Sequence, residues 1–313
     1  MNILEVKNLT ILFDGKKAVD DLSFDLQEGE IVGLVGESGC GKSLTAYSVL
    51  GIFPPGCLHT GKIYFKGTDL LSLNEESKRK IRGNNISLIP QDPLSALNPV
   101  FTVGEQIREV LEVHKGVTQD EGHNFVINAL KAVNVSNPEQ RVNDYPHQFS
   151  GGMMQRALIA MALATSPDIL IADEPTTALD VTIQMQILEL MKSLKNKGQS
   201  ILLITHDLAQ VQEVCDRIFV MYLGKIVESG TTKEIFSNPK HPYTIGLLNS
   251  LPDENKKTLT PISGQVPSIF SIPAGCAFHK RCPFVFNKCK EEIPDLYNVK
   301  NSQAHKSRCF LEI

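Results

Sequence analysis

The sequence lacks a long hydrophobic run, which argues against a membrane-spanning helix. Its longer apolar stretches, such as residues 157–164, fall far short of the roughly 18 residues that a spanning helix needs. The first five residues, MNILE, also lack the basic and apolar regions of a secretion signal. We therefore expect a cytosolic chain that acts on a membrane only through a partner.

An excess of positive charge is also missing. The 313 residues include 31 Lys and Arg against 35 Asp and Glu, a formal net charge of -4. Proteins that bind nucleic acid or acidic lipid usually carry a basic stripe or patch, so no nucleic-acid partner is expected. Hydrophobic residues make up 42% of the chain, enough for the core of one large α/β domain or of two domains.

Short apolar segments separated by turn signals predict a β-rich first part of the chain. The expected strands are 4–6, 22–26, Ile31–Val35, 62–65 and Ile86–Ile89. From about residue 92 to 165 the apolar spacing becomes mainly helical, with helices expected at 103–113 and 124–133. A helical subdomain is therefore predicted to be inserted into an α/β core.

The pattern after residue 165 predicts a parallel sheet. Residues 169–172 and 201–204 are continuous apolar runs, of the kind buried in such sheets. Between them, Ile183, Ile187 and Leu190 share one helical stripe. This order of strand, helix and strand is the βαβ rhythm of a mostly parallel sheet.

The composition changes near the C-terminus. Beyond Pro252, Lys, Pro, Ser and Cys become frequent and little periodicity remains. We therefore expect a boundary near residue 253, between a domain of residues 1–253 and an extension of residues 254–313.

A phosphate-binding motif follows the expected strand Ile31–Val35. Its residues, Gly36-Glu37-Ser38-Gly39-Cys40-Gly41-Lys42-Ser43, fit the pattern G-x-x-x-x-G-K-[ST]. The glycines let backbone N–H groups surround nucleotide phosphates, and the following helix adds the positive end of its dipole. Lys42 is expected to bridge the β- and γ-phosphates, and Ser43 to ligate Mg²⁺. The alternative is a chance glycine-rich turn, which the position between a strand and a helix disfavours.

Two adjacent carboxylates follow the apolar run 169–172. Because ligands of open α/β sheets bind at the carboxyl ends of strands, we expect Asp173 to hold Mg²⁺ and Glu174 to act as general base for water. Gln91 and His206 follow expected strands in the same way, as candidates for Mg²⁺ and for the γ-phosphate. Each alone is more often an ordinary loop residue, but together the four predict one hydrolytic site.

A serine and two glycines begin a further helix. The segment Phe149-Ser150-Gly151-Gly152-Met153 predicts a Ser-capped helix start with free N–H groups for an anion. In isolation, a helix cap with no other role would be the preferred interpretation.

The order of these motifs resembles the ABC (ATP-binding cassette) ATPases over roughly residues 1–250. The order is 36–43, Gln91, 150–152, Asp173-Glu174, Ala178-Leu179-Asp180 and His206. The resemblance implies an α/β fold of the P-loop NTPase (RecA-like) type. Its mostly parallel sheet core would carry an antiparallel β subdomain and the inserted helical subdomain, about residues 92–165.

The same resemblance implies that ATP and Mg²⁺ bind and that ATP hydrolysis drives transport. Two ATPase subunits would pair head to tail, so that Ser150, Gly151 and Gly152 of one serve the ATP that the other cradles. Asp180 would be a further nucleotide-binding residue. Phe13 lies where the family places an aromatic ring on adenine.

Two segments near the C-terminus resemble a narrower group of ABC ATPases. Residues 238–244 and 275–283 look like the extension found in oligopeptide, dipeptide and nickel importers. The resemblance implies two membrane permease subunits, an extracytoplasmic solute-binding protein, and a second ATPase subunit, either a paralogue or a second copy. The chain would then lie peripherally on the cytoplasmic face of the cell membrane.

Four of the seven cysteines gather in the extension: Cys276, Cys282, Cys289 and Cys309. In a reducing cytosol such a cluster suggests a metal before a disulfide. The spacing lacks the paired C-x₂-C of zinc ribbons, and four thiolates match the requirement of a [4Fe–4S] cluster. The resemblance favours iron, since some relatives with this extension carry such a cluster. Zinc, with His279 or His305 as substitute ligands, and free or disulfide-linked cysteines are the alternatives.

Two other functions fit parts of the sequence. A soluble ABC ATPase that acts on ribosomes or DNA usually carries two cassettes, whereas this chain has one P-loop and one serine–glycine signature. A P-loop kinase would need neither residues 150–152 nor His206. An energy-coupling ATPase for the uptake of peptides or metal chelates is the leading interpretation.

Overall fold

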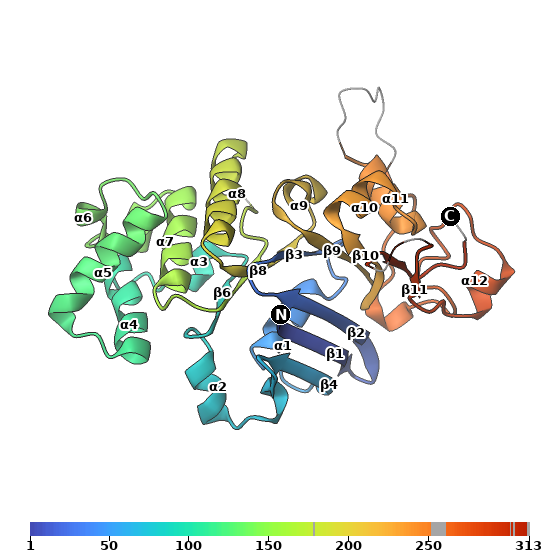
Figure 1. Cartoon of the computed structure of the whole chain (residues 1–313), viewed down its shortest axis with the longest axis horizontal. Coiled ribbons are helices and arrows are strands. Elements are labelled where there is room, and N and C mark those ends of the chain that lie inside the picture. The colour runs from blue at the N-terminus through green and yellow to red at the C-terminus, as the bar shows by residue number, and fades with distance from the viewer. Residues whose placement is uncertain (178, 252–260, 301, 303, 312–313) are drawn as a thin grey trace. The chain divides into compact units, whose positions relative to one another are not determined.

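The computed structural model describes residues 1–177, 179–251, 261–300, 302 and 304–311. The chain forms two compact units, and Figure 1 shows their elements in chain order. The first unit comprises Met1–Gln27, Ile31–Leu71 and Leu203–Ile313, and the second comprises Glu28–Glu30 and Ser72–Leu202. The predicted boundary near residue 253 falls in the stretch 252–260, outside the described residues.

An antiparallel sheet in the first unit has the strand order β2-β1-β4-β5. Its strands are β1 (Asn2–Phe13), β2 (Lys16–Gln27), β4 (Leu58–Phe65) and β5 (Thr68–Asp69). Asp14 and Gly15 link β1 to β2 with φ values of 47° and 73°, the left-handed pair that a two-residue hairpin with matching twist requires. This sheet is the expected antiparallel β subdomain.

The same unit contains the strand that precedes the P-loop. Strand β3 (Ile31–Val35) is buried along its whole length and pairs in parallel with β9 (Arg217–Tyr222). Strand β9 pairs antiparallel with β10 (Lys225–Thr231), which continues to β12 (Lys306–Ser307) and β11 (Tyr297–Asn298). The helices are α1 (Lys42–Val49), α9 (Leu208–Val214), α10 (Thr232–Ser237), α11 (Pro242–Asn249) and α12 (Asn287–Glu291), with 3₁₀ turns at Leu70–Ser72 and Ile269–Ser271.

The second unit combines a parallel strand pair with a group of helices. Strand β6 (Ile86–Ile89) runs parallel to β7 (Ile169–Asp173), and β8 (Ser200–Thr205) continues from this unit into the first. The helices are α2 (Glu75–Ile81), α3 (Pro93–Ala96), α4 (Val103–Lys115), α5 (Gln119–Ala132), α6 (Pro138–Arg141), α7 (Gly151–Leu163) and α8 (Val181–Asn196), with a 3₁₀ turn at Pro146–Gln148. Helices α3, α4, α5 and α7 gather as one group in Figure 1.

The predicted strands and helices are present, and their ends show which signals were missed. Strands Ile31–Val35 and Ile86–Ile89 match residue for residue, because both are short apolar runs between turns. Helix α5 begins at Gln119, five residues before the predicted start, because Thr118 and Glu121 form a capping box. The parallel pairs β3–β9 and β6–β7 fit the mostly parallel sheet core that the sequence predicts.

Candidate functional site

The P-loop, residues 36–43, connects β3 to α1 and is shaped by two close backbone approaches. A Cβ at Gly36 would lie 2.1 Å from the Met221 carbonyl oxygen. Gly41 has a φ of 107°, and a Cβ there would lie 2.8 Å from Met221 Cε and 3.0 Å from the Ala18 oxygen. Only glycine fits at both positions. Between them, Ser38 and Gly39 are exposed.

Lys42 lies inside this loop. It is 4% exposed, and its ammonium donates to the carbonyl oxygens of Gly36 (2.7 Å) and Glu37 (3.1 Å). A buried ammonium needs polar partners, and these two oxygens hold the charge at the start of α1, where phosphates bind well. Cys40 is also buried, and burial raises the pKa of its thiol.

Two other predicted residues belong to the first unit. Phe13 is the last residue of β1 and is half-buried. His206 directly follows β8 and is exposed. Both therefore stand at strand ends, and the sequence predicted this position for His206.

The second unit brings Glu174 and Gln91 into contact. Asp173, 1% exposed, is the last residue of β7, and Glu174 follows it at 7% exposure. Gln91 Nε2 donates to Glu174 Oε2 at 2.8 Å, and Thr177 Oγ1 donates to the same oxygen at 3.0 Å. Two residues that the sequence separates by 83 positions therefore share one hydrogen bond at the ends of two parallel strands.

Glu174 also has an unusual backbone conformation. Its φ of 48° lies in the left-handed region, which costs a non-glycine residue on the order of 1–2 kcal/mol. Such strain persists where the surrounding structure fixes the residue, and it is frequent at active sites. Thr177, which sequence reasoning missed, helps to fix the side chain; its position three residues after Glu174 was the available signal.

The serine–glycine signature has a structural role in the second unit. Ser150 caps α7 by accepting a hydrogen bond from the Met153 N–H (3.3 Å). A Cβ at Gly152 would lie 2.9 Å from Ile183 Cγ2 of α8, so this glycine permits close helix packing. Asp180 caps α8 through the Ile183 N–H (3.0 Å). Ala178, beside it, lies outside the described residues.

The four cysteines of the extension line one small cavity. Cys276, Cys282, Cys289 and Cys309 surround it together with His241 and His279. All are free thiols, so the disulfide alternative is not realised. Burial, together with the nearby thiols of the other three cysteines, raises the pKa of Cys276 to about 11. His305 instead lies against Glu228, with 2.7 Å between Nε2 and Oε1.

Comparison with known proteins places the chain in a family. The model of the ABC transporter family matches residues 19–177, and a model of the oligopeptide/dipeptide transporter C-terminal region matches residues 227–289. This chain belongs to the ATP-binding subunits of ABC transporters. It is 49% identical to the dipeptide transport ATP-binding protein DppD of Bacillus subtilis, over 99% of this chain and 95% of that protein.

Further relatives agree with this family. The oligopeptide transport ATP-binding protein AppD of Bacillus subtilis is 48% identical, over 99% of this chain and 96% of that protein. Among solved structures, the ATP-binding cassette MJ0796, in a dimeric post-hydrolysis state bound to ADP and Pi, aligns with a TM-score of 0.66 at 28% identity. That alignment covers 73% of this chain and 98% of that one. The predicted family, fold and ATPase class are thereby confirmed.

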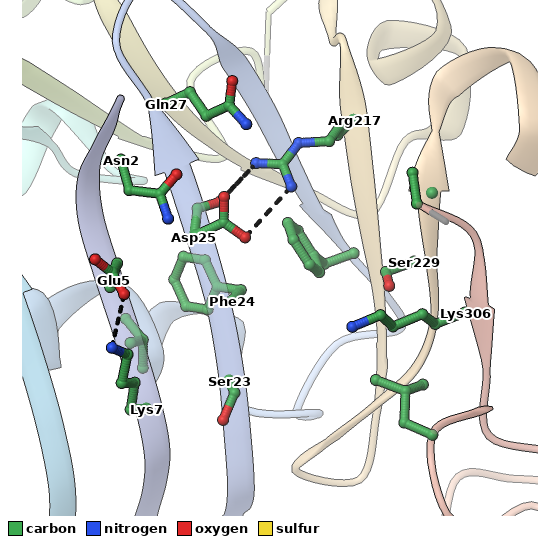
Figure 2. Close-up of a pocket in the computed structure, with 15 residues that line it drawn as sticks. Asn2, Glu5, Lys7, Ser23, Phe24, Asp25, Gln27, Arg217, Ser229 and Lys306 are labelled. Carbon is green, nitrogen blue, oxygen red and sulfur yellow. Dashed lines mark hydrogen bonds and ion pairs between the residues drawn. The ribbon is translucent and has the colours of Figure 1, made fainter. Parts of the chain in front are cut away.

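A separate pocket of this ABC subunit contains none of the predicted site residues. It measures about 510 Å³ and lies between β1 and β2 on one side and β9 and β10 on the other. Figure 2 shows Arg217 paired with Asp25 inside it, at 2.8 Å for the shorter contact. Within the described part of the chain, no helix has the length and apolar character needed to cross a membrane.

Proposed function

We propose that this subunit binds and hydrolyses ATP to power the uptake of peptides through partner permeases. The observation that carries the proposal is the structure of the P-loop. Gly36 and Gly41 allow close backbone packing, and Lys42 is buried at the start of the following helix. The peptide solute follows the names of the relatives DppD and AppD. Nickel or another metal chelate is the alternative solute.

The proposed roles follow from the motifs that each unit contains. In the first unit, the N–H groups of residues 36–41 and Lys42 bind the phosphates, Ser43 ligates Mg²⁺, Phe13 stacks on adenine, and His206 approaches the γ-phosphate. In the second unit, Asp173 and Gln91 bind Mg²⁺. Glu174 activates the attacking water as general base, and the hydrogen bonds from Gln91 and Thr177 orient its carboxylate.

Assembly completes the function. Residues 150–152 and Asp180 serve the ATP of a second ATPase subunit, a paralogue or a second copy, in a head-to-tail pair. Two permease subunits and an extracytoplasmic solute-binding protein complete the importer. The chain then lies on the cytoplasmic face of the membrane, as a domain of residues 1–253 followed by the extension 254–313.

Replacing Lys42 tests the proposal directly. Lys42→Ala removes a charged contact to phosphate, so the dissociation constant of a non-hydrolysable ATP analogue should rise at least about tenfold. Lys62→Ala, an exposed lysine of β4 in the same unit, is the control and should bind as the wild type does. Unchanged binding by a folded Lys42→Ala chain contradicts the proposal. Copurification with membranes that is lost without the permeases distinguishes an importer from a soluble ABC ATPase.

We further propose that the cysteine-lined cavity holds a [4Fe–4S] cluster, with zinc as the alternative. Among the described side chains, no three His, Cys, Asp or Glu groups converge closely enough to hold a single metal ion. A four-iron cluster distributes its four thiolate ligands over separate irons, which suits cysteines arranged around a cavity. Bound metal would favour the thiolates that burial otherwise disfavours and would staple a small extension.

Metal analysis tests this second proposal. Anaerobic purification should yield brown protein with about four irons per chain. Colourless protein with stoichiometric zinc would show that the cavity binds zinc and not a cluster. Folded protein without metal would contradict both the cluster and the zinc site.

A further inference from the structure

Glu37, the second residue of the P-loop, is bonded through its backbone and its side chain. Its N–H donates to Tyr243 Oη (2.8 Å), and its carbonyl oxygen accepts from Lys42 Nζ (3.1 Å) and from the Cys40 N–H (3.3 Å). Its carboxylate accepts two hydrogen bonds from Arg281, at 2.6 and 2.9 Å. The P-loop is therefore tied at this residue both to its own lysine and to distant parts of the chain.

Both distant partners are held firmly. Tyr243, in α11, is fully buried, and its ring lies 4.7 Å from that of Tyr222 and 5.4 Å from that of Phe278. The Arg281 guanidinium lies 5.9 Å from the ring centres of Tyr222 and Phe278, at a separation typical of cation–π contacts. Its Nε donates to the Ser263 oxygen (3.1 Å).

The ion pair between Arg281 and Glu37 is strong for a contact at a loop. The Arg281 side chain is only 4% exposed and that of Glu37 27%, and the pair has the two-point geometry that arginine forms with carboxylates. The hydrogen bonds that Arg281 donates to the Glu37 carboxylate raise the pKa of Arg281 above its ordinary value. Removing either partner leaves a poorly solvated charge, which is costly, so the pair fixes the position of Glu37.

We propose that Arg281 and Tyr243 are positioning residues of the P-loop, through which the C-terminal region sets the affinity for nucleotide. They act on Glu37, whose carbonyl oxygen shares the Lys42 ammonium with that of Gly36. When Glu37 is fixed, the loop backbone and Lys42 are already arranged to receive phosphates. Less free energy is then lost to ordering the loop on binding. The inference rests on the proposed binding of ATP at the P-loop.

Equilibrium binding of a non-hydrolysable ATP analogue to the full chain tests the inference. Arg281→Gln should raise the dissociation constant about tenfold, within the range usual for coupling between sites. Arg281→Lys, which keeps one charged contact, should fall between Arg281→Gln and the wild type. The matched control is Arg217→Gln, which breaks another partly buried Arg–carboxylate pair of the first unit. It should lower the unfolding temperature but leave the dissociation constant unchanged.

A double-mutant cycle shows whether the effect passes through Glu37. Arg281→Gln and Glu37→Gln should each weaken binding, and the double variant should be no weaker than either, because both remove one contact. Fully additive effects, or wild-type affinity in folded Arg281→Gln, overturn the inference. If Arg281→Gln fails to fold, Tyr243→Phe and Glu37→Gln decide, and wild-type affinity in both is the contrary result.

The Lys42→Ala variant separates this inference from the proposed function. A wild-type chain that binds no nucleotide would refute both. A chain that loses binding in Lys42→Ala but keeps it in Arg281→Gln would refute the positioning role alone.

Discussion

The P-loop and the cysteine-lined cavity belong to the same unit but are built in opposite ways. The P-loop is eight consecutive residues, and its shape follows from glycines that contact Met221 and from the helix that starts at Lys42. The cavity takes its cysteines from two separate segments of the chain. A Cβ at Gly275 would lie 2.5 Å from the Cys289 oxygen, and the Cys276 N–H donates to that oxygen at 2.8 Å.

This difference bears on what each site needs in order to form. The residues of the P-loop are contiguous between β3 and α1, whereas the cavity depends on packing between residues 276–289 and Cys309. Arg281 lies beside Cys282 of the cavity and bonds to Glu37 of the P-loop. The P-loop is therefore supported by the region that contains the cysteine-lined cavity.

The largest effect is expected at the nucleotide site, from the loss of the proposed general base. Glu174→Gln should keep ATP binding but lower the hydrolysis rate by about 10²–10⁴-fold, the usual loss when a general base is removed. Glu189→Gln, an exposed glutamate of α8, should hydrolyse at the wild-type rate. Steady-state phosphate release measures both, and normal turnover by Glu174→Gln would rule out the assignment.

A substitution in the serine–glycine signature should lower the rate of ATP hydrolysis without weakening ATP binding to the same chain. Ser150→Arg places a bulky charge at the signature that we propose serves the partner's ATP, so turnover should fall by more than about tenfold, as for other losses of preorganised donors. ATP affinity of the single chain should stay near the wild-type value. Light scattering with ATP, in the presence of the second ATPase subunit, should show no dimer. A normal ATP-dependent dimer is the contrary outcome.

Replacing one cysteine of the cavity tests the metal site proposed for the C-terminal extension. Cys276→Ser should lose most of its iron after anaerobic purification, because one of the four proposed thiolate ligands is missing. Cys57→Ser changes a cysteine outside the cavity and should keep the metal. Elemental analysis and the absorption near 400 nm measure the difference, and full iron content in Cys276→Ser would contradict the cavity assignment.

The smallest effect concerns thiol reactivity in the P-loop. Burial raises the pKa of Cys40, so at pH 8 less of it is thiolate than for an ordinary cysteine, and alkylation needs the thiolate. Cys57, which is half-exposed, should be alkylated first in native protein, and Cys40 should react only after unfolding. Peptide mass spectrometry follows both sites. Equal rates for the two thiols in the folded chain would contradict the packing of the loop.

The sequence located contiguous motifs and the residues at strand ends, and it missed features that no motif marks. The P-loop, Asp173 and Glu174 were located because a contiguous motif and an apolar strand mark them. The left-handed backbone of Glu174 leaves no such mark, and the role of Gly152 depends on Ile183 in another helix. The ion pair of Arg281 and Glu37 joins residues 244 positions apart, so no sequence motif predicts it.

The central claim is that this subunit supplies the energy of transport by hydrolysing ATP at the P-loop. The most direct measurement is ATP hydrolysis by the membrane complex purified with its permeases and second ATPase subunit. Peptide-loaded binding protein should stimulate Mg²⁺-dependent phosphate release, and Lys42→Ala in this chain should remove most of that stimulation. Peptide-stimulated hydrolysis at the wild-type rate by the Lys42→Ala complex would contradict the account.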